Sequence, residues 1–188
     1  MNTIPDGPDG WTLKCVILAH SRYYSSPHAM YMTYSNGNTT KWEQQLQSLR
    51  TALMLAHLLN RTLILPEFSC DGCTSKACSI RSGKCNLMAH LEMAVFNEHF
   101  EYREYMFLSH PLVPSSIKTS VSQEISFQSV SDFELNNPLF KDNHHILVVK
   151  SLDGYIPFLE KNVDKYFLNH VNNGLKGCDY NQHCTMHP

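Results

Sequence analysis

A polar loop in front of the longest apolar segment holds the first residues that could bind a ligand. The loop reads "YSNGNTTKWEQ" and covers residues 34–44. Its amides and hydroxyls can hydrogen-bond to phosphate oxygens or to sugar hydroxyls. We predict that Asn36, Gly37, Gln44 and Gln45 form a ligand-binding loop. The alternative interpretation is structural, because an Asn-Gly turn followed by a capping Thr pair is also typical of the start of a helix.

The cysteines form a second group with chemical potential. Six of the seven cluster at two places: Cys70, Cys73, Cys78 and Cys85, and then Cys178 and Cys184. In an oxidising compartment such a cluster is typical of disulfides, and in a reducing one it is typical of metal or redox chemistry. Cys70 and Cys73 could begin a zinc site and His90 could add a ligand, but a second closely spaced pair is missing. Disulfides, zinc and free thiols all remain open on spacing alone.

Acidic and histidine side chains could supply a general base. Together with one arginine they form a group at Glu98, His99, Glu101, Arg103, Glu104 and His110, and a histidine pair follows at 144–145. Glutamates at intervals of three are equally typical of the solvated face of a helix. The histidine pair precedes an aliphatic run, which predicts one imidazole inward and one outward. No catalytic residue is predicted from these patterns.

The elements that must position these groups alternate between strands and helices. β-Branched and aliphatic runs predict strands, and apolar residues at steps of three and four predict helices. The expected strands cover 11–20, 29–35, 62–66 and 144–152, and the expected helices cover 43–59, 86–100 and 156–171. A strand, a helix and a strand with short joints favour parallel pairing. We therefore predict an α/β fold, with a Rossmann-like parallel sheet and flanking helices.

The helix expected over 43–59 has the clearest pattern. Its apolar residues begin as one stripe and then surround the helix: Leu46, Leu49, Leu53 and Ala56 first, then Ala52, Leu55, Leu58 and Leu59. A helix of this kind is expected to lie against a sheet. Asn60 should end it, because Asn tolerates the left-handed conformation. Arg61 is expected to pair with a carboxylate or to lie at the sheet edge rather than to touch a substrate.

The totals describe one ordinary globular domain. The chain has 188 residues, of which 43% are hydrophobic and 17% charged, and its formal net charge is −2. We expect a disordered leader at 1–10, a single domain at 11–175 and a tail at 176–188, with a cysteine-rich loop at 69–85 and a mobile loop at 115–137. A nucleic-acid partner is not expected, because no run of like charges occurs. The longest apolar run, 52–59, is much shorter than the roughly 20 residues that span a bilayer.

One segment resembles a known family. The stretch "QLQSLRTALMLAHLLNRTLILPEF" (45–68) resembles the first helix and second strand of O-fucosyltransferase-like glycosyltransferases. In that family a glycine-rich loop ending in Asn-Gln leads into a Leu/Ala helix, a Leu-Asn-Arg-Thr-Leu joint, an aliphatic strand and Pro-x-Phe. Here Gln45 takes the place of the motif's Gln, and the joint is at 59–63. The family's two glycines and Asn are replaced by residues 40–44, which read "TKWEQ".

The resemblance implies one lobe of a two-lobed glycosyltransferase of GT-B type. Such enzymes transfer fucose from GDP-fucose to an acceptor hydroxyl on a glycan or a protein, without a cofactor and usually without a metal. The chain would correspond to the N-terminal lobe, with the donor-binding lobe lacking. The implied compartment is the lumen of the endoplasmic reticulum or Golgi, or the outside of the cell, and it favours disulfides among the six clustered cysteines. It also makes Asn38 and Asn60 candidates for N-glycosylation, because each begins an Asn-x-Thr triplet.

Three functional hypotheses remain open at this point. The first is a fucosyltransferase-like glycosyltransferase that binds a nucleotide sugar and an acceptor. The second is a non-catalytic α/β module that binds a glycan or a protein, as a pseudoenzyme or truncated isoform. The third is a zinc-binding regulatory domain organised by the cysteines between Cys70 and Cys85.

Overall fold

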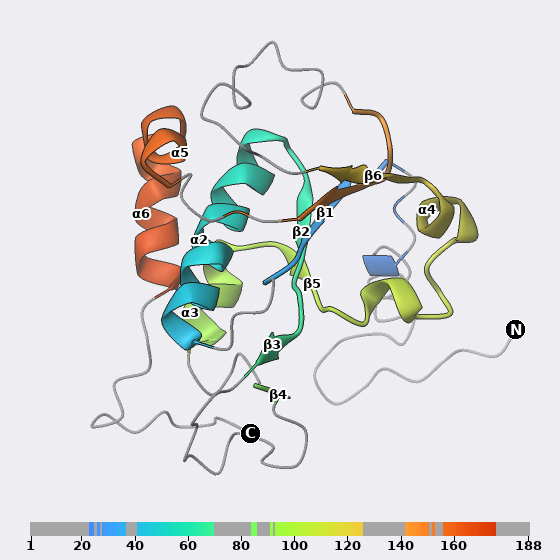
Figure 1. Cartoon of the computed structure of the whole chain (residues 1–188), viewed down its shortest axis with the longest axis horizontal. Helices are drawn as coiled ribbons and strands as arrows, with labels where there is room; N and C mark the ends of the chain where they lie inside the picture. Colours follow the sequence, from blue (N-terminus) through green and yellow to red (C-terminus); the bar gives the residue numbers. More distant parts are fainter. Residues whose placement is uncertain are drawn as a thin grey trace, which may run out of the picture.

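A single parallel sheet forms the centre of the molecule in the computed structural model (Figure 1). The structure describes residues 23–24, 26, 28–36, 41–69, 84–85, 91, 93–125, 142–150, 152 and 156–175. The five strands of the sheet are β1 (Tyr31–Tyr34), β2 (Thr62–Ile64), β5 (Tyr102–Arg103), β6 (Val121–Ile125) and β7 (Ile146–Val149). Their order is β5-β2-β1-β7-β6, and all neighbours pair in parallel. The predicted α/β fold with a Rossmann-like parallel sheet is confirmed.

The central strand β1 has parallel neighbours on both sides. Tyr31 is in register with Thr62 of β2 on one side and with Ile146 of β7 on the other. The helix α2 (Trp42–Leu58) connects β1 to β2 and crosses the sheet between them. The expected strand–helix–strand unit is therefore present, with the two strands running in the same direction.

Helices cover both faces of the sheet, unequally. On one face α2 packs with α3 (Met93–His99), α5 (Ile156–Asn162) and α6 (Lys165–Gly174), as Figure 1 shows. This face has the larger core, which contains Met32 and Tyr34 of β1. The other face carries the short 3₁₀ helix η2 (Phe107–Ser109) and α4 (Ser115–Thr119), which pack on Tyr31. Alternate side chains of β1 thus enter opposite cores, as a strand buried on both faces requires.

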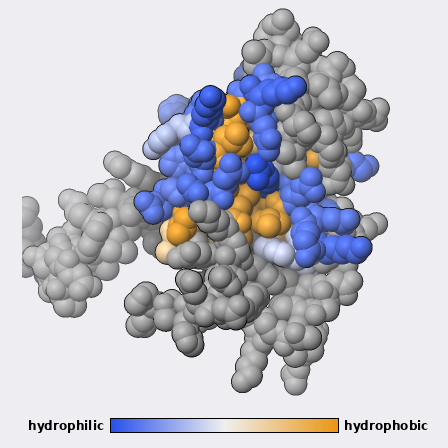
Figure 2. Space-filling model, turned by 90° about the vertical axis from the view of Figure 1, so that its left-hand side faces the viewer, coloured by the Kyte–Doolittle hydropathy of each residue, from blue (hydrophilic) through white to orange (hydrophobic). Residues whose placement is uncertain are grey.

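The apolar pattern of α2 agrees with its position between the sheet and the outer helices. Leu49, Ala52, Leu53, Leu55 and Ala56 are all buried. Figure 2 shows the outer side of the helical layer, where hydrophilic side chains predominate and leave a narrow strip of apolar surface between them. No helix in the described part of the chain is long and apolar enough to cross a membrane.

The joint between α2 and β2 has the expected construction. Asn60 takes a left-handed φ of 51°, which reverses the chain directly after the helix. The amide of Asn60 donates to the His57 carbonyl and the amide of Arg61 donates to the Ala56 carbonyl. Three residues, 59–61, are enough here because the left-handed residue turns the backbone while its amide stays bonded to the helix. The prediction for Asn60 is confirmed.

Three expected boundaries were wrong. The helix expected at 156–171 is two helices, because Asp164 is extended and its side chain accepts from the Phe167 amide, which starts α6 anew. Within the helix expected at 86–100, the described residues form α3 but Leu91 lies outside any helix, while residues 86–90 and 92 are outside the described part of the chain. Residues 115–125 were expected in a mobile loop, but they form α4 and β6. Ser, Gln and Glu in β6 conceal the strand pattern, because β6 lies outermost in the described sheet and exposes most of its side chains.

Several sequence predictions fall outside the described residues. These are the leader at 1–10, the strand at 11–20, the tail at 176–188 and the remainder of the expected loop at 126–137. The same holds for Gly37, Asn38, His90 and the side chains of the six clustered cysteines. The ends of the cysteine-rich loop are described: β3 (Phe68–Ser69) pairs antiparallel with β4 (Lys84–Cys85).

Candidate ligand site at the carboxyl edge of the sheet

The carboxyl ends of β1 and β7 mark the point where the strand order reverses. From β1 the chain moves outward to β2 and β5, whereas β7 and β6 lie on the other side. In open parallel sheets ligands bind outside the carboxyl ends of the strands at this point. The residues that follow β1 and β7, and those that begin α2, are therefore the candidates for a site.

Asn36 and Gln45 meet at this edge, as the sequence predicts. The Asn36 Nδ2 group is 3.4 Å from Gln45 Oε1 and 3.3 Å from the Glu67 carbonyl oxygen. Asn36 follows β1, Gln45 lies in the first turns of α2 and Glu67 follows β2. The Asn36 side chain thus links the chain after β1 to two other segments at the carboxyl edge, the start of α2 and the chain after β2.

Gln45 has a structural role at this edge. Its side chain is fully buried. Its Nε2 donates to the Ser69 carbonyl at 2.7 Å, and its Oε1 accepts from the Ser69 amide at 2.8 Å. This pair of bonds resembles the pairing of two strands and fixes the chain after β2 against α2. Both polar atoms of the Gln45 amide are therefore engaged within the protein.

Two polar atoms at the end of β1 have no hydrogen-bond partner within the described structure. They are the Asn36 Oδ1 atom and the Tyr34 hydroxyl, and both are inaccessible to solvent. Burial raises the pKa of the Tyr34 phenol well above its usual value, so the group stays neutral. A buried amide oxygen without a partner costs free energy, and a donor from a ligand would remove that cost.

Two lysines add positive charge at the same edge, and sequence reasoning missed both. Lys41 is the N-cap of α2, where its carbonyl accepts from the Gln45 amide, and Lys150 follows β7. Both side chains are exposed. The signal for Lys150 was its position directly after an aliphatic run. The N-cap itself is Lys41, and the Thr pair expected to cap the helix lies outside the described residues.

Of the other predicted loop residues, Gln44 lies in the first turn of α2 with an exposed side chain. Glu43 in the same turn and Glu67 after β2 are also exposed. The edge therefore carries charges of both signs, and a ligand that binds here must fit between them.

The acidic and histidine group divides between the two edges of the sheet. His99 and Glu101 precede β5 at the amino edge, whereas Glu104 follows β5 at the carboxyl edge. Glu101 and Glu104 both line a cavity of about 470 Å³ beside β5. Arg103 closes one side of it: its Nη2 is 3.0 Å from a Glu101 carboxylate oxygen, and its guanidinium lies 4.2 Å from the centre of the Tyr23 ring. The cavity thus brings together Glu101, Arg103 and Glu104 but neither His99 nor His110 of the predicted group.

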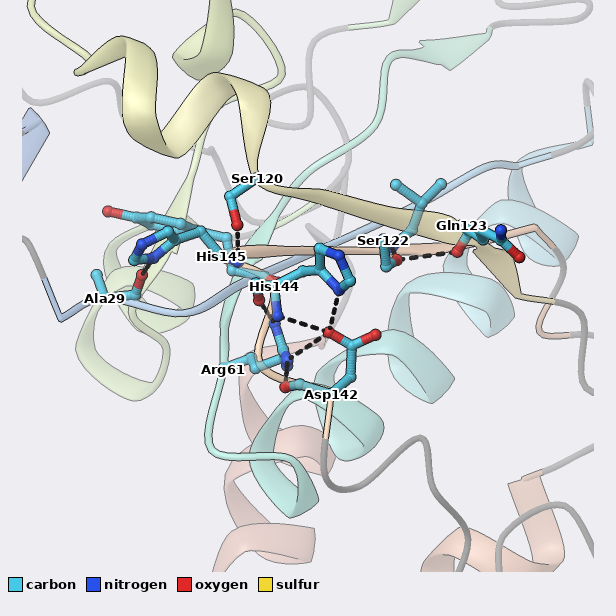
Figure 3. A network of polar contacts seen from close by, with 10 residues as sticks. Ala29, Arg61, Ser120, Ser122, Gln123, Asp142, His144 and His145 are labelled. Carbon is cyan, nitrogen blue, oxygen red and sulfur yellow. Dashed lines mark hydrogen bonds and ion pairs between the residues drawn. The ribbon is translucent and has the colours of Figure 1, made fainter.

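The amino edge is occupied by a network around Arg61 (Figure 3). The buried Arg61 guanidinium donates to the carbonyls of Tyr31, His144 and Asp142 at 3.1, 2.9 and 2.6 Å. The Asp142 carboxylate lies 3.7 Å from the guanidinium and accepts from the His144 amide at 2.7 Å. Burial lowers the pKa of Arg61, and Asp142 opposes that effect. The prediction that Arg61 is structural agrees with these contacts.

The histidine pair before β7 behaves as predicted. The His144 side chain is exposed and its Nδ1 is 3.0 Å from Asp142, whereas His145 is partly buried with its Nδ1 3.3 Å from the Ala29 carbonyl. The His145 amide donates to the Ser120 hydroxyl at 3.0 Å, which joins β6 to β7 (Figure 3). These contacts hold strand ends together and leave the carboxyl edge as the candidate site.

Comparison of the chain with protein-family models, with curated proteins and with solved structures gave no match. Among the described residues no three His, Cys, Asp or Glu side chains gather as metal ligands would. The geometry of the carboxyl edge is therefore the basis for a functional proposal.

Proposed function

We propose that this protein is glycosyltransferase-like and binds a nucleotide sugar at the carboxyl edge of its sheet, between the end of β1 and the start of α2. The proposal rests on the position and burial of the Asn36 side chain. It lies where the strand order reverses, and its amide oxygen is buried without a partner in the described structure. A sugar hydroxyl or a nucleobase N–H can donate to that oxygen.

The amino end of α2 and two lysines favour a diphosphate at this edge, although the exposed carboxylates of Glu43 and Glu67 oppose it. The amino end of α2 carries the positive end of the helix dipole, which is worth about 0.3–1 kcal/mol for an anion at an exposed site. Lys41 and Lys150 are exposed at the same edge. A nucleoside diphosphate would place its phosphates at the first turn of α2 and its sugar or base at Asn36. Gln45 would act indirectly, because it holds the wall formed by Ser69.

Thermal unfolding with added ligands tests the proposal. GDP-fucose and GDP should raise Tm by at least about 5 °C at 100 times Kd, as expected for a ligand that binds the folded state of a protein of this size. Free fucose should give a smaller shift, since it lacks the diphosphate. Asn36→Ala should reduce the shift, and Asn169→Ala, an exposed residue of α6, should not.

The outcomes separate this proposal from a simple glycan-binding module. Stabilisation by nucleotide sugars that Asn36→Ala weakens supports the proposal. Stabilisation by oligosaccharides but not by any nucleotide sugar would replace it with a non-catalytic glycan-binding role. Equal shifts in Asn36→Ala and the native protein would place the ligand elsewhere.

A further inference from the structure

Two histidines meet on the helical side of the molecule, away from the carboxyl edge. The Nδ1 atoms of His99 and His170 are 2.6 Å apart, and the ring centres are 4.5 Å apart. His99 is the last residue of α3, and His170 lies in the middle of α6. Both side chains are partly buried. At this distance the two lone pairs cannot both face each other, so one nitrogen must carry a proton or both must bind a cation.

The packing of α3 against α6 positions the pair. Phe100 follows His99 directly, and its ring lies against Gly174 at the end of α6. A Cβ atom at position 174 would be only 2.4 Å from the Phe100 ring, so glycine permits the close approach. The backbones are thus fixed one turn from His170. The packing of the two helices therefore keeps the two imidazoles close together.

One side of the pair, at His99, has room for water. His99 lines a cavity of about 290 Å³, which Glu101 and His57 also line. On the other side the exposed Tyr166 packs on the His170 ring at 4.2 Å between ring centres. Two carboxylates on the neighbouring segments already have partners: Arg103 for Glu101 and His57 for Asp164. The exposed Glu98 precedes His99 and adds negative charge on α3.

We propose that His99 and His170 form a two-histidine binding site for a divalent transition metal, with Zn²⁺ as the reference ion and water completing its coordination. Imidazole nitrogen is a preferred ligand of Zn²⁺, Ni²⁺ and Cu²⁺. With Zn–N bonds of about 2.0–2.1 Å in a tetrahedral site, the two nitrogens would be roughly 3.3 Å apart. The pair must therefore open by roughly 0.7 Å, which rotation of the partly exposed rings can supply. The ion would connect α3 to α6, at a place independent of the proposed nucleotide site.

Equilibrium dialysis with Zn²⁺ tests this site. The native protein should bind one equivalent more than His99→Ala or His170→Ala, and the double variant should lose no more than each single one. His28→Ala, an exposed histidine in a distant segment, should retain the equivalent. The cysteines are common to all five proteins, so zinc bound by thiols cancels in the comparison. Saturating Zn²⁺ should also raise the Tm of the native protein more than that of either variant.

NMR of the native protein tests the same site without a variant that could fail to fold. Long-range ¹H–¹⁵N spectra of the imidazoles should show the Nδ1 signals of His99 and His170 shifting together as Zn²⁺ is added. Unchanged signals for this pair, or equal zinc content in all five proteins, would show that the two rings are joined only by a hydrogen bond and would overturn the proposal.

Discussion

Gln45 binds the backbone of Ser69 in both directions: its Nε2 donates to the carbonyl at 2.7 Å and its Oε1 accepts from the amide at 2.8 Å. The two residues are 24 positions apart, and this contact joins the start of α2 to the strand β3 that follows β2. These bonds fix Ser69 beside α2 at the carboxyl edge. Asn36 contacts the same Gln45 side chain.

Removal of this contact should destabilise the fold. Gln45→Ala leaves the Ser69 amide and carbonyl without their partner, and we expect it to lower the free energy of unfolding by about 2–3 kcal/mol. Gln47→Ala is the matched control, because Gln47 is exposed on the same helix and should change stability by less than about 0.5 kcal/mol. Urea denaturation followed by circular dichroism measures both. Equal effects of the two substitutions would show that the Gln45 contact does not stabilise the fold.

The two helix-associated arginines should differ in their importance. Arg61 is buried and donates to three carbonyls, so Arg61→Ala should cost about 3–5 kcal/mol. Arg50 forms a partly exposed ion pair with Glu160 at 2.8 Å, and Arg50→Ala should cost about 0–1 kcal/mol. Arg61→Lys should not restore stability, because an ammonium group cannot reach three carbonyls in a planar fork. A lysine variant as stable as the native protein would contradict this role for the guanidinium.

Local patterns explain why part of this fold is predictable from the sequence. The apolar residues around α2, the left-handed Asn60 and the aliphatic β2 are all signals within a few residues of one another, and together they indicate a parallel strand–helix–strand unit. The two-residue β5 and the polar β6 give no such signal. They are strands because β2 and β7 offer them free edges, which is information from distant parts of the chain.

The candidate site was predictable to a similar extent. The polar loop before a helix indicated Asn36 and Gln45, because a ligand-binding loop needs amides near a helix start. The bonds from Gln45 to Ser69 and the meeting of His99 with His170 depend on tertiary packing. No spacing rule links residues that are 24 or 71 positions apart. Lys150 was missed because a single lysine after a strand has no distinctive neighbours.

The start of α6 should respond to acid. A hydrogen bond from the Phe167 amide, and then the contact with His57, lower the pKa of Asp164 below its usual 3.8. A lowered pKa in the folded state means that Asp164 contributes stability above about pH 3.8, and that this contribution disappears as the pH falls through the lowered value. Asp164→Ala should therefore be less stable than the native protein at pH 7 and equally stable near pH 2. Asp164→Asn should keep much of the stability at pH 7, because Asn is also a good N-cap. A difference between native protein and Asp164→Ala that stays constant with pH would contradict this account.

The close approach of α3 and α6 should require glycine at position 174. Gly174→Ala adds a methyl group against the Phe100 ring and should destabilise the protein by about 1–3 kcal/mol, although Ala is the better helix former. Phe100→Leu in the same chain should relieve part of this cost, since the smaller side chain leaves room for the methyl group. A double-mutant cycle in urea measures the coupling between the two positions. Strictly additive effects would mean that the contact between Phe100 and residue 174 does not determine the packing.

NMR mapping of bound GDP-fucose tests the nucleotide-sugar site between β1 and α2. Addition of GDP-fucose to the ¹⁵N-labelled protein should shift the backbone amides of Ser35, Asn36 and the first turn of α2, together with that of Lys150. The amides of Arg61, His144 and His145 lie at the opposite edge of the sheet and should not move. Shifts confined to the carboxyl edge would support a nucleotide-sugar site between β1 and α2. An unchanged spectrum at millimolar GDP-fucose, or shifts centred on Arg61, would contradict it.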